Sequence, residues 1–300
     1  MDSKLKYHYC SIETFKAIIE NKTLRFSDIT KSNDSTELKY ISKYLDKIYE
    51  EEISRIQNEG SYESISFINP RKCFDKFKDA YFNRVLSDED KTFWFFTSCF
   101  SLKRDSLSQW RGYAEDGKGF CIGFDDKYFK DLNTNGFNLL SIKSDLIEYE
   151  EKKQINIVKV CIRKLIDTLV DSAEHNSLDM ITVKSTYLNC FQTLLEKSVF
   201  MKNPFFYEEE EWRMSFMYFP NKDFPQEVLL AQNGKPLSFP IKFQKNRDKL
   251  VSYFDLKWKP DVVKEIILGP KNHSDLSDIK MFVGNNGFKC DVSRSDGTYI

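Results

Sequence analysis

One short and very apolar segment most constrains what this chain can fold into. Residues 92–101 read TFWFFTSCFS and form the most apolar strand candidate in the sequence. A run that is apolar on both faces is typical of a strand buried at the centre of a sheet. No apolar stretch approaches the ~18 residues that a membrane-spanning helix needs. We therefore expect a globular fold organised around a sheet, with no membrane association.

Strand candidates lie at both ends of the chain, with helix candidates between them. Alternating or apolar runs predict strands at residues 7–10, 24–27, 119–124, 211–219, 238–243, 262–268 and 290–293. Apolar residues at helical spacing predict helices over about 11–21, 38–60, 73–85, 105–114, 155–172, 181–201 and 274–283. Ser11 and Ser274 are the expected N-caps of the first and last helix. This order favours a single α+β domain over 1–300, with a mixed sheet and a helical insert at about 125–205.

Composition argues against several classes of protein. Lys plus Arg number 45 and Asp plus Glu number 46. This balance argues against a protein that binds nucleic acid or membranes mainly through a polybasic arm. The seven cysteines are odd in number and no pair has CxxC spacing, which disfavours a zinc site or a disulfide framework. Only three histidines occur, which disfavours a multi-histidine metal centre. We expect reduced thiols, no metal and a cytoplasmic location.

His8 is the first candidate site residue. It lies between Tyr7 and Tyr9 on the opening strand candidate. A neutral imidazole can hydrogen-bond to a ribose hydroxyl or an amide, and flanking aromatic rings can stack on a base or a nicotinamide. The alternative is a half-buried structural histidine in an edge strand.

A polar loop candidate follows the second strand candidate. Residues 33–37 read NDSTE, and Glu37 stands three residues after Asp34, which fits a capping box. Asn33 and Asp34 both favour turns and caps. A carboxylate in such a loop could also line a cleft.

A third cluster follows the apolar strand. Ser98 and Ser101 lie towards its end, where ligands tend to bind in sheets that alternate with helices. Trp110 and Tyr113 are three residues apart and share a helical face, so they could form an aromatic wall. The alternative is that both rings are ordinary core residues. Cys99 is a weak candidate nucleophile because no histidine lies nearby in sequence.

Four consecutive glutamates precede the strand candidate at 211–219. Strand alternation would place Glu209, Glu211 and Arg213 on one face, with Glu208 and Glu210 on the other. Two carboxylates beside an arginine give one group for binding and one for catalysis, and the arginine would keep the carboxylates ionised. The alternative is a charged edge strand that resists aggregation.

The motifs described so far resemble a bacterial family, domain of unknown function 2971. The resemblance rests on YHYCSIETFKAIIENKTLRFSDITKSNDSTE, SCFSLKRDSLSQWRGYAEDGKGFCIGF, MKNPFFYEEEEWRM and EIILGPKN, in this order. It spans the chain from about Lys6 to the last strand candidate. Asn33, Asp34, Trp110 and Tyr113 belong to this pattern. The family name implies no activity.

A more distant resemblance is to DarT-type and other ADP-ribosyltransferases. An opening strand with a central histidine, a helix of the SIETFKAII kind and a second strand are similar to the start of those enzymes. The resemblance implies a split-sheet α+β fold that binds NAD in a cleft, with Glu211 of the Glu-x-Glu pair catalytic. It also implies that His8 holds the NAD ribose or amide, and that Ser98 or Ser101 corresponds to a strand serine.

We therefore expect an NAD-dependent ADP-ribosyltransferase or NAD-cleaving effector, as in a toxin or a phage-defence protein with a partner. The acceptor would be a nucleic acid or a protein. The catalytic candidates are Glu211 and Glu209, and the NAD-binding candidates are His8, Tyr9, Ser27, Asn33, Asp34, Ser98, Ser101, Trp110, Tyr113 and Arg213. One alternative is a non-catalytic module that binds a nucleotide or a protein. Another is a metal-dependent nuclease using Asp34, Glu37, Glu209 and Glu211, which would need these carboxylates to converge.

Overall fold

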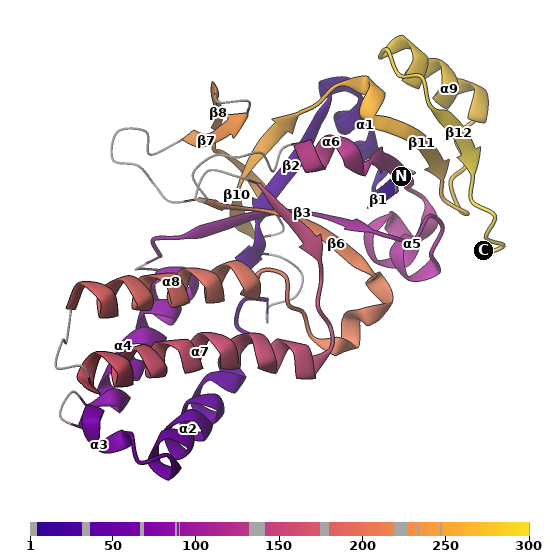
Figure 1. Cartoon of the computed structure of the whole chain (residues 1–300). Helices are drawn as coiled ribbons and strands as arrows, with labels where there is room; N and C mark the ends of the chain where they lie inside the picture. Colours follow the sequence, from indigo (N-terminus) through magenta and orange to yellow (C-terminus); the bar gives the residue numbers. More distant parts are fainter. Residues whose placement is uncertain are drawn as a thin grey trace. The chain divides into compact units, whose positions relative to one another are not determined.

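The computed structural model describes residues 5–31, 37–66, 69–87, 89, 91–131, 142–174, 180–218, 227–232, 235–246 and 248–299. The chain divides into two compact units, each built from separate stretches. Unit 1 takes Met1–Lys31, Phe95–Ile147 and Phe205–Ile300, and unit 2 takes Ser32–Trp94 and Glu148–Pro204 (Figure 1). The sequence predicted one domain with a helical insert at 125–205. The helical unit instead combines Glu148–Pro204 with the earlier stretch Ser32–Trp94.

Unit 1 is built on a mixed sheet to which ten of the described strands belong. Its main path runs in the order β12-β11-β4-β1-β3-β2-β10-β9, and β6 pairs with both β3 and β5. β11 and β12 pair in parallel, whereas β1 and β4 pair antiparallel. The strands of the sheet are β1 (Leu5–Cys10), β2 (Thr23–Asp28), β3 (Trp94–Ser101), β4 (Phe120–Asp125), β5 (Lys143–Leu146), β6 (Glu211–Tyr218), β9 (Lys242–Asn246), β10 (Lys249–Lys257), β11 (Val263–Leu268) and β12 (Asp291–Arg294). A separate hairpin consists of β7 (Glu227–Gln232) and β8 (Lys235–Pro240).

The prediction of a buried strand within residues 92–101 is confirmed by β3. Its side chains from Phe95 to Ser98 are all buried, and the strand pairs with β1, β2 and β6. β4 is buried over almost its whole length for the same reason, because it lies inside the sheet between β1 and β11. Strands and helices in this arrangement confirm the α+β class.

β1 and β2 both pair with β3, at different positions along it, and the space between them is called the fork below. β1 pairs with β3 at Tyr7 and Ser101, whereas β2 pairs with it at Ser27–Thr97 and Asp28–Phe96. No ladder joins β1 to β2 in the part of the chain that is described. The helix α1 (Ile12–Asn21) connects the two strands, and Ser11 caps it as predicted by accepting a hydrogen bond from the Thr14 amide at 3.1 Å.

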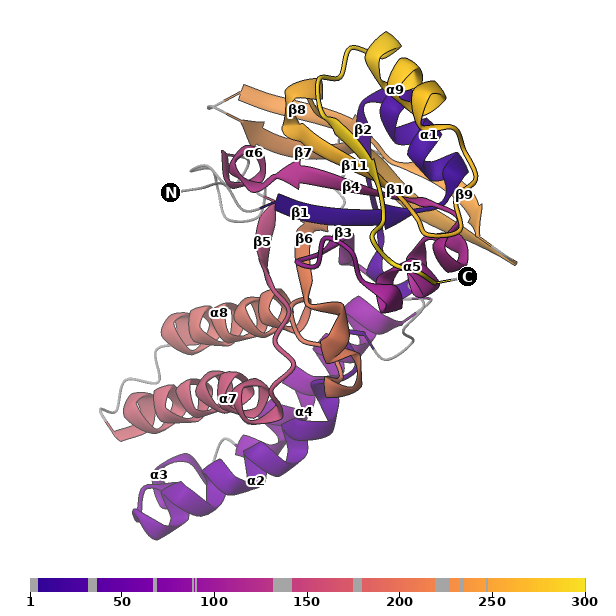
Figure 2. The ribbon, with the colours of Figure 1, turned by 90° about the vertical axis from the view of Figure 1, so that its right-hand side faces the viewer.

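The described part of unit 1 also contains the α-helices α5 (Leu107–Tyr113), α6 (Asp126–Asp131) and α9 (Leu276–Asn285). The Phe15 ring of α1 stacks on the Phe120 ring of β4 with 3.8 Å between ring centroids, and its centroid lies 6.0 Å from that of Phe282 on α9. Helices α1 and α9 therefore pack side by side on the sheet (Figure 2). α5 contributes Trp110 to a core cluster with Tyr9.

Unit 2 consists of α2 (Ser42–Asn58), α3 (Tyr62–Ile65), α4 (Pro70–Tyr81), α7 (Glu151–Glu174) and α8 (Met180–Ser198). Glu52 on α2 is fully buried and accepts hydrogen bonds from Arg55 at 2.8 Å and from Arg163 of α7 at 2.9 Å. This carboxylate therefore ties α2 to α7 through charge-assisted bonds. None of the described helices has the length and apolarity to cross a membrane.

Several element boundaries differ from the sequence predictions. The expected strand 238–243 is two strands, β8 and β9, with a break at Ile241. Ser274 is not the N-cap of the last helix, because that helix begins one residue later, after Asp275. Strands β5, β7 and β10 were not predicted. β10 reads KLVSYFDLK, and its adjacent apolar pairs Leu250–Val251 and Tyr253–Phe254 interrupt the alternation that would have predicted a strand.

Candidate functional site

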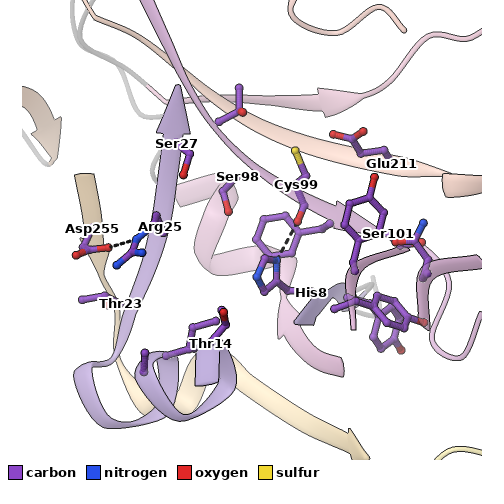
Figure 3. Close-up of a pocket in the computed structure, with 18 of the residues that line it drawn as sticks. His8, Thr14, Thr23, Arg25, Ser27, Ser98, Cys99, Ser101, Glu211 and Asp255 are labelled. Atoms are coloured by element: carbon purple, nitrogen blue, oxygen red, sulfur yellow. Dashed lines mark hydrogen bonds and ion pairs between the residues drawn. The ribbon is translucent and has the colours of Figure 1, made fainter. Parts of the chain in front are cut away.

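A pocket of about 800 Å³ opens in the fork of unit 1, within the 300–1,000 Å³ typical of small-molecule sites. Its walls come from β1, α1, β2, β3, α5 and the start of β6, with β9 and β10 at one side (Figure 3). Among its residues are the predicted candidates His8, Tyr9, Ser27, Ser98, Ser101, Tyr113, Glu209 and Glu211. Segments far apart in the chain therefore bring most of the candidate residues together.

His8 lies on β1 with a defined tautomer. Its Nδ1 is 3.0 Å from the Cys99 carbonyl oxygen of β3 (Figure 3). A carbonyl only accepts, so Nδ1 carries the hydrogen, and Nε2 of the neutral ring is an acceptor. Burial lowers the pKa of His8 below its usual value, although the bond to Cys99 acts in the opposite direction. The pocket therefore favours a neutral histidine.

The hydroxyl groups of Ser98 and Ser101 on β3 differ in their hydrogen-bond partners. Ser101 Oγ donates to the Glu209 carbonyl at 2.8 Å and accepts from the Lys103 amide at 3.1 Å. Ser98 lies on the pocket wall, and its Oγ is buried with no hydrogen-bond partner among the described residues. Ser101 is thus held by the fold, whereas Ser98 has an unused hydroxyl beside the pocket.

The glutamates before β6 reach the pocket by a turn and not by strand alternation. Residues 204–209 form a short 3-10 helix, β6 begins only at Glu211, and Glu210 between them has a φ of 41°. Glu210 thus departs from strand conformation between the two elements, and Glu209 and Glu211 both line the pocket. The prediction that alternation from 209 to 213 sets their common face is therefore wrong. Glu210 is exposed and its carboxylate lies 3.3 Å from Lys103 Nζ.

Glu211 and Arg213 do lie on the same face of β6. The Arg213 Nε donates to Glu211 Oε1 at 2.7 Å, and both side chains are buried. The contact is a charge-assisted hydrogen bond, which holds the two side chains in a fixed relative orientation. Glu211 lines the pocket, while Arg213 is outside the residues that line it and supports Glu211.

The two aromatic candidates on α5 are in different environments. Tyr113 is 42% exposed, lines the pocket and donates from its hydroxyl to Glu209 Oε1 at 2.8 Å. Trp110 is only 1% exposed and packs edge-on against Tyr9 at 4.8 Å between ring centroids. The pair does not form one aromatic wall, because Trp110 packs against Tyr9 and donates to Asp105 in the core, whereas Tyr113 stays at the surface. Trp110 is thus a core residue.

Tyr9 and Ser27 also lie at the pocket. The Tyr9 hydroxyl donates to the Lys103 carbonyl at 2.9 Å and accepts from the Ser106 amide at 3.0 Å. Burial raises the pKa of Tyr9 well above its usual value, so this hydroxyl is a fixed structural link. Ser27 comes from β2 and is half-buried.

Charged residues at the side of the pocket were missed from the sequence. Arg25 of β2 and Lys242 of β9 both pair with Asp255 of β10, at 3.3 and 3.1 Å. Lys257 lines the same side. The alternation of β2 gives a signal for this side, because Arg25 shares a face with the candidate Ser27. The β9–β10 contribution needed knowledge of strand pairing.

The remaining candidates cannot be placed in this pocket. Asn33 and Asp34 lie outside the described residues, and Glu37 is a buried residue of unit 2. In the described ranges, no group of three or more His, Cys, Asp or Glu side chains could hold a metal ion. None of the seven cysteines, all of which lie among the described residues, forms a disulfide.

Comparison with known proteins gives one finding. A family described as protein of unknown function (DUF2971) matches residues 109–214. Residues 109–214 belong to this family. The match covers Tyr113, Glu209 and Glu211, whereas His8 and Ser98 lie before it. It is shorter than the span from about Lys6 to the last strand candidate over which the sequence motifs suggested the resemblance. No curated protein and no solved structure matched the chain.

Proposed function

We propose that the unit 1 pocket binds NAD and cleaves the bond between nicotinamide and ribose. The observation that supports this is the meeting of His8, Ser98 and Glu211, from three separate strands, in one pocket of suitable size. In such a reaction nicotinamide leaves with the bonding electron pair, and the ribose develops an oxocarbenium-like positive charge. An acceptor hydroxyl or water then bonds to the ribose and releases a proton.

Glu211 is the residue that would stabilise the developing charge. A preorganised carboxylate acts most strongly in a site that excludes water, and the Glu211 side chain is only 6% exposed. The hydrogen bond from Arg213 Nε would fix the orientation of the Glu211 carboxylate. Glu209, on the other side of the turn, is a further carboxylate at the pocket and would orient the acceptor.

His8 would orient the substrate. Its Nε2 is a hydrogen-bond acceptor in the neutral ring, which suits a ribose hydroxyl or the amide N–H of nicotinamide. The Ser98 hydroxyl would donate to or accept from the same part of the ligand. The exposed ring of Tyr113 offers a flat apolar surface for stacking.

The charged side of the pocket fits the negative part of NAD. Arg25, Lys242 and Lys257 would offer cationic groups to a diphosphate, which would compete with Asp255 for Arg25 and Lys242. An activity of this kind would suit an ADP-ribosyltransferase-like effector in a toxin or defence system, with a nucleic acid or a protein as acceptor.

The test is NAD binding by calorimetry together with nicotinamide release, with and without nucleic acid or cell lysate as acceptor. We expect binding, and release that increases with the right acceptor. Binding without turnover would favour a nucleotide-binding module. Neither binding nor turnover would reject NAD as the ligand.

A further inference from the structure

Residues 295–299, called the strap here, are hydrogen-bonded to the loop that precedes α5. The Ser295 hydroxyl donates to the Asp105 carboxylate at 2.8 and 3.0 Å, and the Asp296 amide donates to it at 2.8 Å. The same carboxylate accepts from Trp110 Nε1 at 2.5 Å. Asp105 therefore joins the strap directly to the buried residue of α5.

The other end of the strap holds the turn that follows α5. The Tyr299 hydroxyl donates to Asp116 Oδ1 at 2.7 Å, and Lys271 Nζ contacts both Asp116 Oδ2 at 2.9 Å and the Tyr299 ring at 4.0 Å. Arg111 of α5 lies 5.3 Å from the same ring. The strap is thus fixed to both ends of α5.

The backbone of this turn needs such support. Glu115, Asp116 and Gly117 have consecutive φ values of 51°, 56° and 87°. Left-handed non-glycine residues are costly and persist where their surroundings hold them. The Gly117 carbonyl also accepts a hydrogen bond from the Lys271 amide at 2.9 Å. The turn is held by contacts from outside α5, and the Tyr299–Asp116 bond is one of them.

We infer that the strap is a positioning element for the pocket, acting through α5. This helix has only seven residues, too few to be stable alone. It carries Gln109 and Tyr113 to the pocket wall, and Tyr113 holds Glu209 at 2.8 Å. Loosening the strap would therefore displace Tyr113 and weaken its hydrogen bond to the Glu209 carboxylate. The catalytic consequence rests on the proposed function, whereas the positioning of α5 does not.

The experiment is amide hydrogen exchange of the full chain, comparing Tyr299→Ala and Tyr299→Phe with the wild type. Ala removes both the hydroxyl bond to Asp116 and the ring contact with Lys271, whereas Phe removes only the bond. We expect amides of residues 110–114 to exchange roughly tenfold faster or more in the Ala variant, and less so in the Phe variant. Amides of β11 should keep their wild-type rates, because the change is local.

Lys264→Ala is the matched control. Lys264 makes a bond to the Asp261 carbonyl at 2.7 Å and an ion pair with Asp125 at 3.7 Å in the same unit, without touching α5. It should leave exchange of residues 110–114 unchanged. Unchanged exchange there in Tyr299→Ala, or an equal increase throughout unit 1, would overturn the inference.

A kinetic readout separates positioning from simple stabilisation. If the wild type turns over NAD, Tyr299→Ala should lower kcat/KM about tenfold below its unfolding temperature, and Tyr299→Phe should recover part of the loss. If the wild type does not turn over NAD, the proposed function fails, but the exchange result still decides whether the strap positions α5.

Discussion

Replacing Ser98 with alanine should make the ligand-free protein more stable. The Ser98 hydroxyl is buried, lies on the pocket wall and has no hydrogen-bond partner among the described residues. A buried donor without a partner costs about 1–3 kcal/mol, because it has lost its bonds to water. Alanine removes this cost, and it creates little new cavity because the side chain already borders one.

Ser101→Ala is the same substitution three residues along the same strand, and it should act in the opposite direction. Its hydroxyl makes bonds of 2.8 and 3.1 Å to the backbone of Glu209 and Lys103. Losing them would leave a carbonyl and an amide without these partners, at a cost of roughly 1–2 kcal/mol. The predicted difference between the two variants is therefore about 2–5 kcal/mol in the free energy of unfolding.

Denaturant unfolding followed by tryptophan fluorescence measures this difference in unit 1, which holds Trp110, Trp212 and Trp258. We expect the midpoint to rise for Ser98→Ala and to fall for Ser101→Ala. NAD affinity should nevertheless fall roughly tenfold in Ser98→Ala, since the ligand loses a hydrogen bond. If both variants are destabilised equally, Ser98 has a partner in the folded protein and the reasoning is refuted.

Three further predictions concern single side chains. Because burial lowers the pKa of His8, the unfolded chain binds more protons than the folded chain below pH 6.5, so stability should fall as the pH drops through that range. Unfolding at pH 7.5 and 5.5 should show a smaller drop for His8→Asn, and an equal drop would contradict this. Tyr113→Phe loses the bond to Glu209 at an exposed site, so stability should change by less than about 1 kcal/mol while nicotinamide release falls several-fold. Unchanged release would show that Tyr113 does not position Glu209. In unit 2, Glu52→Gln weakens the bonds to Arg163 and should cost about 1–3 kcal/mol, measured by loss of helical circular dichroism in denaturant. A neutral result would mean that the arginines find other partners.

Local patterns predicted the parts of unit 1 that depend on neighbouring residues. The apolar run of β3, the Ser11 cap of α1 and the position of His8 between two tyrosines can all be read from short windows. The candidates Ser98 and Glu211 followed from their places at strand ends. Their meeting in one pocket could not be derived locally, because it depends on the pairing of strands far apart in the chain.

The errors have specific physical causes. Glu210 adopts a left-handed conformation that no local pattern of four glutamates signals, so a turn was mistaken for a strand. Trp110 is buried by Tyr9 and by the bond to Asp105, contacts that helical spacing alone does not contain. Arg25 was missed because its pocket neighbours belong to β9 and β10.

The measurement that tests the central claim most directly is nicotinamide release by Glu211→Gln and Glu210→Gln, compared with the wild type. Glutamine at 211 keeps the shape and an oxygen for Arg213 but removes the charge, so the rate should fall about 10²–10³-fold. Glu210 is exposed and paired with Lys103, so its glutamine variant should keep nearly the wild-type rate. Circular dichroism would confirm that both variants fold. An equal loss in the two variants, or full activity in Glu211→Gln, would contradict the account.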